Sequence, residues 1–149
     1  MRRHPLRAAL LAIALSVTPA CAAFRAADAV NTVAAAETAD QKAYALLLGY
    51  AAVLEEATDI VADPETPPPV KTALARAERI ATPAADMLRV AFATYLRARA
   101  DYEAQIGADA SRRERAAAAF VLAAQALDEA ITRARDPFAA FTAALKQSR

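Results

Sequence analysis

Alanine dominates this sequence, and its abundance restricts what the chain can fold into. Roughly three residues in ten are Ala, the best helix former, whereas Gly occurs only twice and Trp does not occur. The 149 residues are enough for one domain of ordinary size. The composition therefore predicts a single all-α domain and argues against a sheet-based fold.

The first 22 residues have the pattern of an export signal. Arg2, Arg3 and Arg7 come before an apolar run at 8–17, and small residues follow that run. A run of about ten residues is half of what a helix needs to cross roughly 30 Å of hydrocarbon, which argues against a permanent membrane anchor. We therefore expect residues 1–22 to be a Sec-type signal peptide and the protein to be exported.

Two ways of processing this signal are open. Small residues at Ala20 and Ala22 fit ordinary cleavage just after them, which would release a periplasmic protein. Ala20-Cys21 is also similar to the end of a bacterial lipoprotein signal, although Thr18 stands where such signals usually carry Leu, Val or Ile. Cys21 is therefore a candidate lipid attachment site that would anchor the protein to a membrane. Residues 23–37 are predicted to form a flexible lead-in, because they hold few large apolar side chains.

Removal of the signal would leave a chain that lacks several reactive groups. The only His, His4, and the only Cys lie within the first 22 residues, and every acidic residue lies beyond residue 27. A slightly acidic mature chain without imidazole or thiol excludes Ser–His and Cys–His catalysis, zinc sites built from His or Cys, and haem held by His. We therefore expect a protein that is not an enzyme and that holds neither a cofactor nor a metal.

Capping signals and prolines define the first helix and its linker. Thr38-Ala39-Asp40-Gln41 fits a capping box, which predicts a helix over 39–62. Its apolar residues recur at alternating spacings of four and three, as in a helix with one face on a core. The Pro-rich segment 63–69 cannot continue that helix, because each Pro removes a backbone N–H, so it predicts an interhelical linker.

The rest of the chain predicts two further long helices and a short one. The second runs from residue 69 or 70 to Gly107 and is kinked or interrupted at Pro83. Ser111-Arg112-Arg113-Glu114 fits another capping box, which predicts a third helix over 112–135. Asp136-Pro137 would then start a short fourth helix. Residues 38–149 are thus expected to form an up-down three-helix bundle with a short fourth C-terminal helix.

Two groups of side chains are candidates for chemistry. Glu55, Asp59 and Asp63 stand one turn apart and could hold a divalent cation or serve as acid and base, but a solvated acidic face is the favoured interpretation. Aromatic residues at helical spacing continue into the third helix, which makes Phe92, Tyr95 and Phe120 candidate lining residues for an apolar ligand. The alternative for these rings is an ordinary bundle core.

Five arginines gather near the second turn. They are Arg97, Arg99, Arg112, Arg113 and Arg115, and four acidic residues lie among them. Because the mature chain is slightly acidic, we expect no nucleic-acid binding. Anionic lipid headgroups are a better match for such a cluster in an exported protein, so a membrane surface is an expected partner.

Several segments of the chain resemble a known group of proteins. The signal with its small-residue Cys site, the run TADQKAYAL at 38–46, the pair Glu55-Glu56, the Pro-rich break, VKTAL at 70–74 and PAAD at 83–86 carry the resemblance. They are similar to small secreted or lipoprotein-like α-helical proteins of proteobacteria and their phages, over roughly residues 38–103. The resemblance implies a helical module of the cell envelope, and it implies no catalytic residues.

These observations lead to two expectations of function. The first is a non-enzymatic cell-envelope protein that acts as a structural or protein-interaction module through its helix faces. The alternative is a periplasmic carrier that holds a small apolar ligand or lipid between the second and third helices. A core made largely of Ala buries little area, so we expect either a monomer of modest stability or self-association into a homo-oligomer.

Overall fold

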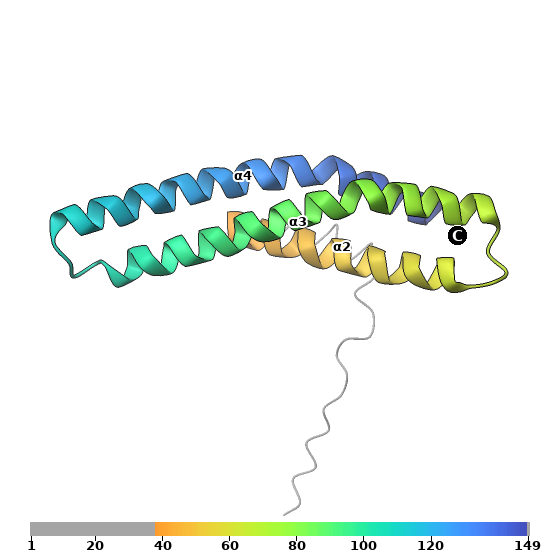
Figure 1. Cartoon of the computed structure of the whole chain (residues 1–149), viewed down its shortest axis with the longest axis horizontal. Helices are drawn as coiled ribbons and strands as arrows, with labels where there is room; N and C mark the ends of the chain where they lie inside the picture. Colours follow the sequence, from red (N-terminus) through yellow and green to blue (C-terminus); the bar gives the residue numbers. More distant parts are fainter. Residues whose placement is uncertain (1–37, 149) are drawn as a thin grey trace, which may run out of the picture.

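The described part of the chain is built from three α-helices joined by two turns (Figure 1). The structure is a computed structural model that describes residues 38–148. α2 spans Ala39–Ala62, α3 spans Pro68–Ala104 and α4 spans Ala110–Gln147. The predictions for the signal peptide at 1–22, for Cys21 and for the lead-in at 23–37 lie outside the described residues. The all-α fold is confirmed for the residues that the structure describes.

α2 begins and ends where the sequence predicts. The Thr38 backbone N–H donates a hydrogen bond to Gln41 Oε1 at 3.2 Å, which is one of the two bonds of a capping box. The helix ends at Ala62, directly before Asp63-Pro64. The Lys71 ammonium then donates to the Asp63 backbone oxygen at 2.6 Å and ties the turn to the next helix. Local backbone chemistry therefore decides both ends of this element.

α3 continues through Pro83 without a break. Pro83 removes one backbone hydrogen bond, but its ring is exposed, so water can reach the carbonyl that is left free. Ala81, Ala84 and Ala85 on either side of it are buried, and their packing holds both halves of the helix in line. The long helices are bowed (Figure 1).

α4 begins before the predicted position. Its N-cap is Asp109, whose carboxylate accepts a hydrogen bond from the Arg112 backbone N–H at 2.9 Å. The expected capping box at Ser111 and Glu114 is therefore wrong. The helix starts at Ala110, only six residues after the end of α3, so the second turn is short.

The expected fourth helix is not a separate element. α4 runs unbroken to Gln147 with Pro137 inside it, so residues 136–147 are its last three turns. Ala134, Phe138, Phe141 and Leu145 are all buried and lie on one face of a continuous helix. Their burial outweighs the cost of an internal proline, which is about 3 kcal/mol in a helix interior.

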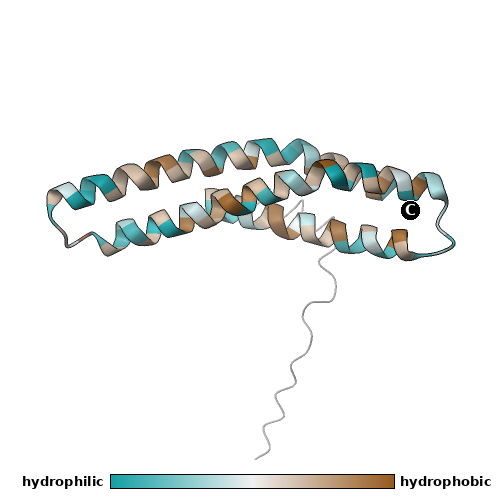
Figure 2. Cartoon of the chain, in the orientation of Figure 1, coloured by the Kyte–Doolittle hydropathy of each residue, from teal (hydrophilic) through white to brown (hydrophobic). Residues whose placement is uncertain are grey.

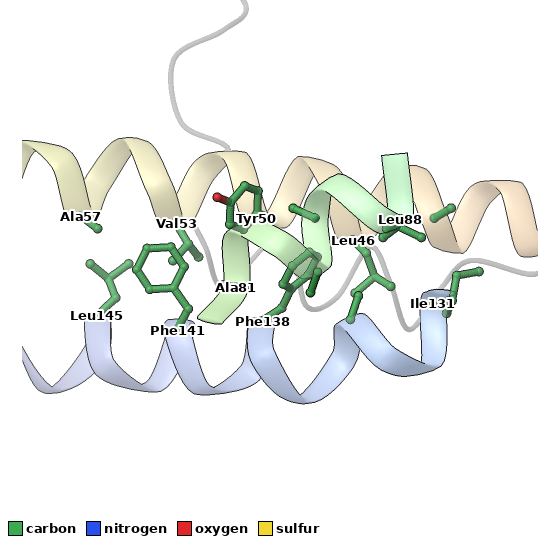
Figure 3. Packing of buried hydrophobic residues seen from close by; sticks show 14 of the residues in the cluster. Leu46, Tyr50, Val53, Ala57, Ala81, Leu88, Ile131, Phe138, Phe141 and Leu145 are labelled. Carbon is green, nitrogen blue, oxygen red and sulfur yellow. The ribbon is translucent and has the colours of Figure 1, made fainter. Parts of the chain in front are cut away.

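The core lies between α2 and the two long helices. Figure 3 shows Leu145, Phe141, Phe138 and Ile131 of α4 pointing toward α2. Tyr50 stacks on Phe138 with ring centroids 5.1 Å apart, and its hydroxyl lies 2.7 Å from the Thr82 Oγ1 of α3. Much of the remaining buried set is Ala, so the helices pack closely around few large side chains.

α2 covers only part of the α3–α4 pair. It has 24 residues against 37 in α3 and 38 in α4, which is roughly 36 Å against 56 Å of helix. Figure 1 shows α2 beginning beside the middle of the long helices and running to the turn that joins it to α3. A three-helix bundle at one end thus passes into a two-helix hairpin at the other.

Candidate interaction surface

The two-helix part of the molecule contains no buried side chain among the described residues. On α3 the last buried residue is Leu88, and on α4 the first is Ala123. We call the segments beyond them, residues 89–104 of α3 and 110–122 of α4 with the turn that joins them, the hairpin end. α2 begins at its border, where Phe92 and Tyr95 still pack against the core cluster and Arg99 reaches Asp40 of α2; the side chains nearer the turn have only the facing helix or solvent beside them.

Large apolar side chains of the hairpin end are exposed. Leu96 and Ile106 come from α3 and the turn after it, and Val121 and Leu122 come from α4. Ile106 is 64% exposed and Leu122 is 66% exposed, so large apolar side chains face solvent near the turn and also several turns away from it. The hydropathy colouring shows apolar positions along both helices in this half (Figure 2). An exposed apolar surface of this kind is typical of an interaction site.

The aromatic residues that the sequence singled out partly come together. Tyr95 of α3 and Phe120 of α4 are in ring contact, with centroids 5.4 Å apart, and Tyr102 stacks on the same Phe120 at 5.7 Å. Phe92 is half-buried and packs against the core cluster instead. The rings of Tyr95, Phe120 and Tyr102 therefore pack on one another between the helices of the hairpin end.

A hollow lies beside these rings, near the turn. It has a volume of about 410 Å³ and is open to solvent. Its lining residues are Tyr102, Ile106, Ala110, Arg113, Glu114 and Ala117. Of the three residues predicted to line a ligand site, none is among them. The walls are mostly apolar with one charge of each sign, which suits an amphipathic side chain better than a charged ligand.

The beginning of α2 marks the border of the hairpin end. Arg99 of α3 approaches Asp40 in the first turn of α2 at 3.4 Å and also pairs with Glu103 at 2.9 Å. A hydrogen bond from the Thr38 side chain lowers the pKa of the Asp40 carboxyl, with a smaller contribution from Arg99. The hydrogen bond and charge of Glu103 raise the pKa of Arg99. The Arg99–Asp40 pair thus ties the first turn of α2 to α3 at the border of the hairpin end.

The arginines near the turn do not form one uniform basic patch. Arg112 pairs with Asp109 at 3.2 Å, and Arg97 donates to the Ala93 backbone oxygen at 3.3 Å. Arg113 faces the hollow beside Glu114. Positive charge at this end is therefore interleaved with carboxylates, and binding to an anionic membrane surface stays a prediction.

One of the three acidic residues that the sequence singled out, Asp63, has a structural role. Asp63 caps the helix end, and its Oδ1 accepts a hydrogen bond from the Glu65 backbone N–H at 2.8 Å. Across residues 38–148 no three His, Cys, Asp or Glu side chains gather in a way that could hold a metal ion. Glu55 and Asp59 are exposed, as a solvated face requires.

Sequence reasoning missed the exposed side chains Leu96, Val121 and Leu122 as candidates. The available signal was the length of the helices: a first helix of 39–62 cannot cover a second one that is half as long again. Which apolar residues are thereby left exposed depends on the register between α3 and α4. That register is not readable from either helix alone.

In the part of the chain that the structure describes, no helix is both long and apolar enough to cross a membrane. No protein-family model, no curated protein and no solved structure matches this chain.

Proposed function

We propose that this protein is a non-enzymatic, exported protein of the cell envelope that binds a partner protein through the hairpin end. The observation that carries the proposal is the partial cover by α2, which leaves apolar side chains of both long helices exposed beyond Leu88 and before Ala123. α2 packs against one half of the α3–α4 pair, so the other half of the same pair is suited to pack against a further helix.

The partner that fits is an amphipathic helix in line with α2. The 16 residues of α3 in the hairpin end span roughly 24 Å, which is the length of a helix of about the same number of residues. Apolar partner side chains would cover Leu96 and Val121, and one of them would enter the hollow between Ile106 and Ala117. Arg113 and Glu114 at its rim would pair with polar groups of the partner.

Site-specific crosslinking tests this function. A photo-crosslinking residue at Val121 in the producing cell is expected to give a covalent adduct of defined mass, whereas the same residue at the exposed Ala140 of the same helix gives none. Leu96→Asp on the facing helix should abolish the adduct, and far-UV circular dichroism should show that this variant is folded. Equal adducts from positions 121 and 140, or an adduct that persists with Leu96→Asp, would refute the proposed surface.

Export and anchoring are supported by the sequence alone, through Arg2, Arg3 and Arg7, the apolar run and Ala20-Cys21. The intact mass of the protein from soluble and membrane fractions tests both. An acylated N-terminus at Cys21 in the membrane fraction would establish a lipoprotein. A mass that begins just past Ala22 in the soluble fraction would establish a periplasmic protein, and an uncleaved chain would contradict export by this signal.

A carrier of a small apolar ligand is the second candidate, and the hollow beside Tyr102 favours it. A ligand deeper between the helices would have to separate the rings of Tyr95 and Phe120, which contact each other. Native mass spectrometry of the purified protein tests this function. A co-purifying ligand that is lost with Ile106→Asp would support the carrier, and a ligand-free mass would end it.

A further inference from the structure

α3 carries a second apolar stripe that faces away from the core. Ile80, Met87 and Val90 are 59%, 52% and 68% exposed, and the exposed ring of Pro83 lies between them. Ile80, Pro83 and Met87 lie outside the hairpin end and Val90 lies at its border, and none of these side chains belongs to the buried set that α2 and α4 cover. Three large exposed apolar residues on about three turns in the middle of a helix are more than scattered surface positions account for.

The spacing of this stripe is that of a coiled-coil seam. Residues 80, 83, 87 and 90 follow one another at intervals of three, four and three, which places them on one line along the helix. A seam of this kind is narrow, whereas a helix that lies on a lipid surface needs an apolar face at least about 100° wide. The exposed Arg79, Asp86 and Arg89 border the stripe closely. The occupant is therefore a helix and not a membrane.

Small side chains lie beside the seam on its α4 side. Ala77, Ala84, Ala91 and Ala98 recur every seven residues along α3, and each is buried or half-buried. This row is covered within the chain, because Ala84 belongs to the core and Ala77 and Ala91 pack against it. Only the ridge of large apolar side chains is left for a second helix.

We propose that two copies of this chain pair through α3 in antiparallel orientation, with this stripe as the seam. The stripe is symmetric about residue 85, so a two-fold axis there places Ile80 opposite Val90 of the second copy and Met87 opposite Pro83 of the second copy. Each large apolar side chain then packs on an apolar one.

Charge selects the antiparallel orientation. Arg76 and Arg97 lie on the same line at the two ends of the stripe. In a parallel pair each of them would face its own copy, a juxtaposition of like charges that destabilises the complex. In the antiparallel pair Arg76 faces Thr94 of the second copy, and Arg97 faces an Ala. The Asp86–Arg89 pair, 3.0 Å apart, borders the stripe near the two-fold axis and brings no net charge to it.

The dimer is weak by its size. A seam of two heptads removes less than the roughly 800 Å² per partner of a standard interface, so we expect a dissociation constant in the micromolar range. The seam shares only Val90 with the hairpin end and contains none of Leu96, Val121 and the hollow residues on which the proposed function rests, so the two proposals can fail independently.

Sedimentation equilibrium over a concentration series that reaches several hundred micromolar tests the dimer. The purified protein should approach twice the monomer mass, and Met87→Glu with Val90→Glu should weaken association at least about tenfold. The matched control is Leu122→Glu, because Leu122 is about as exposed as Val90 but lies on α4, outside the stripe. The control chain has the same N-terminal residues as the seam variant. A monomer throughout the series overturns the proposal, as does a dimer that survives the seam variant or is lost in the control.

Disulfide trapping tests the orientation in a chain with Cys21→Ser. The combination Ile80→Cys with Val90→Cys should form a covalent dimer under mild oxidation, because the two positions face each other across the seam. Neither single variant should do so, since ten residues of helix, roughly 15 Å, separate a position from its own copy in the antiparallel pair. Trapping by Ile80→Cys alone would show a parallel pair and overturn the proposal. Binding of the monomer to anionic vesicles through the same stripe would also overturn the proposal.

Discussion

Tyr50 joins three helices at the level of a single residue. Its ring contacts Phe138 and Phe141 of α4, with centroids 5.1 and 6.2 Å away, while its hydroxyl meets Thr82 of α3. In a core built largely of Ala, one aromatic side chain supplies a large share of the contact between elements. Thr82 is in turn held by Glu78 at 3.3 Å, so the hydroxyl pair belongs to a short polar network at the edge of the core.

Removing the Tyr50 hydroxyl should therefore cost stability without changing the fold. Tyr50→Phe keeps both ring contacts and deletes the 2.7 Å hydrogen bond, which predicts a loss of about 1 kcal/mol in the free energy of unfolding. Denaturant unfolding followed by circular dichroism measures it. Tyr102→Phe, on an exposed ring of the hairpin end, should change the same quantity by less than about 0.5 kcal/mol. Equal effects of the two substitutions would contradict the network.

Asp40 makes stability depend on pH in a defined direction. The pKa of Asp40 is lower in the folded state than in the unfolded chain. At pH values between these two pKa values, the unfolded chain therefore binds a proton that the folded chain does not. The contribution of Asp40 to the free energy of unfolding is therefore complete above the ordinary carboxyl pKa of about 3.9. It is lost as the pH falls through the lower pKa of the folded state. A negative charge in the first turn of α2 is also favoured by the helix dipole.

Asp40→Asn should consequently destabilise the protein at neutral pH and not in acid. We expect a loss of about 0.5 kcal/mol in the free energy of unfolding at pH 7. The difference from the wild type should shrink below about pH 4 and vanish once Asp40 is protonated in both states. Asp59→Asn, in the last turn of the same helix, is the control and should be neutral or slightly stabilising. A loss for Asp40→Asn that is the same at every pH would show that the charge is not its cause.

At the scale of elements, capping chemistry predicted helix ends where one signal stood alone. Each end of α2 has a single signal, which is Thr38 with Gln41 at its start and Asp63-Pro64 at its end. Near the second turn two signals overlap, because Asp109 and Ser111 both cap helices well, and the earlier one wins in the folded chain. Only the packing of α4 on α3 decides between them.

Internal prolines were the second point on which local chemistry misled. Pro137 suggested a new helix, yet Phe138 and Phe141 are buried on the same face as Ile131, so the core holds α4 straight through it. The same competition between backbone cost and packing applies at Pro83 in α3. The cost of an internal proline can be read from the sequence, whereas the stabilisation from packing depends on which side chains the other helices cover.

Pro83→Ala should therefore raise stability. Restoring the backbone hydrogen bond and removing the ring predicts a gain of about 1–3 kcal/mol in the free energy of unfolding, with an unchanged far-UV circular dichroism spectrum. Pro69→Ala is the matched control, because a proline in the first turn of α3 removes no intrahelical bond and its replacement should be nearly neutral. A loss of stability with Pro83→Ala would mean that the proline ring makes favourable contacts that outweigh the missing backbone hydrogen bond.

At the scale of the whole molecule, unequal helix lengths divide one fold into two regions. The buried side chains of α3 end at Leu88, and those of α4 begin at Ala123, so the core occupies the end that α2 covers. The lengths of α2 and α3 were predictable from the sequence, and so was partial cover of α3, whereas α4 is longer than predicted because it continues through Pro137. The identity of the exposed residues was not, because it depends on where Phe120 meets Tyr95 and Tyr102, a register that only the assembled pair defines.

Native-state amide exchange should reveal the two regions directly. Amides at 93–104 and 112–122 have only one facing helix, so local opening there exposes little buried surface and requires less free energy than opening at 74–88 or 127–145. We expect exchange at least about tenfold faster in the first pair of segments, which corresponds to about 1.4 kcal/mol. Uniform protection along both long helices would contradict this expectation. The same measurement separates the two proposed contacts, because a helical partner should slow exchange in the hairpin end, whereas self-association should slow it around residues 80–90.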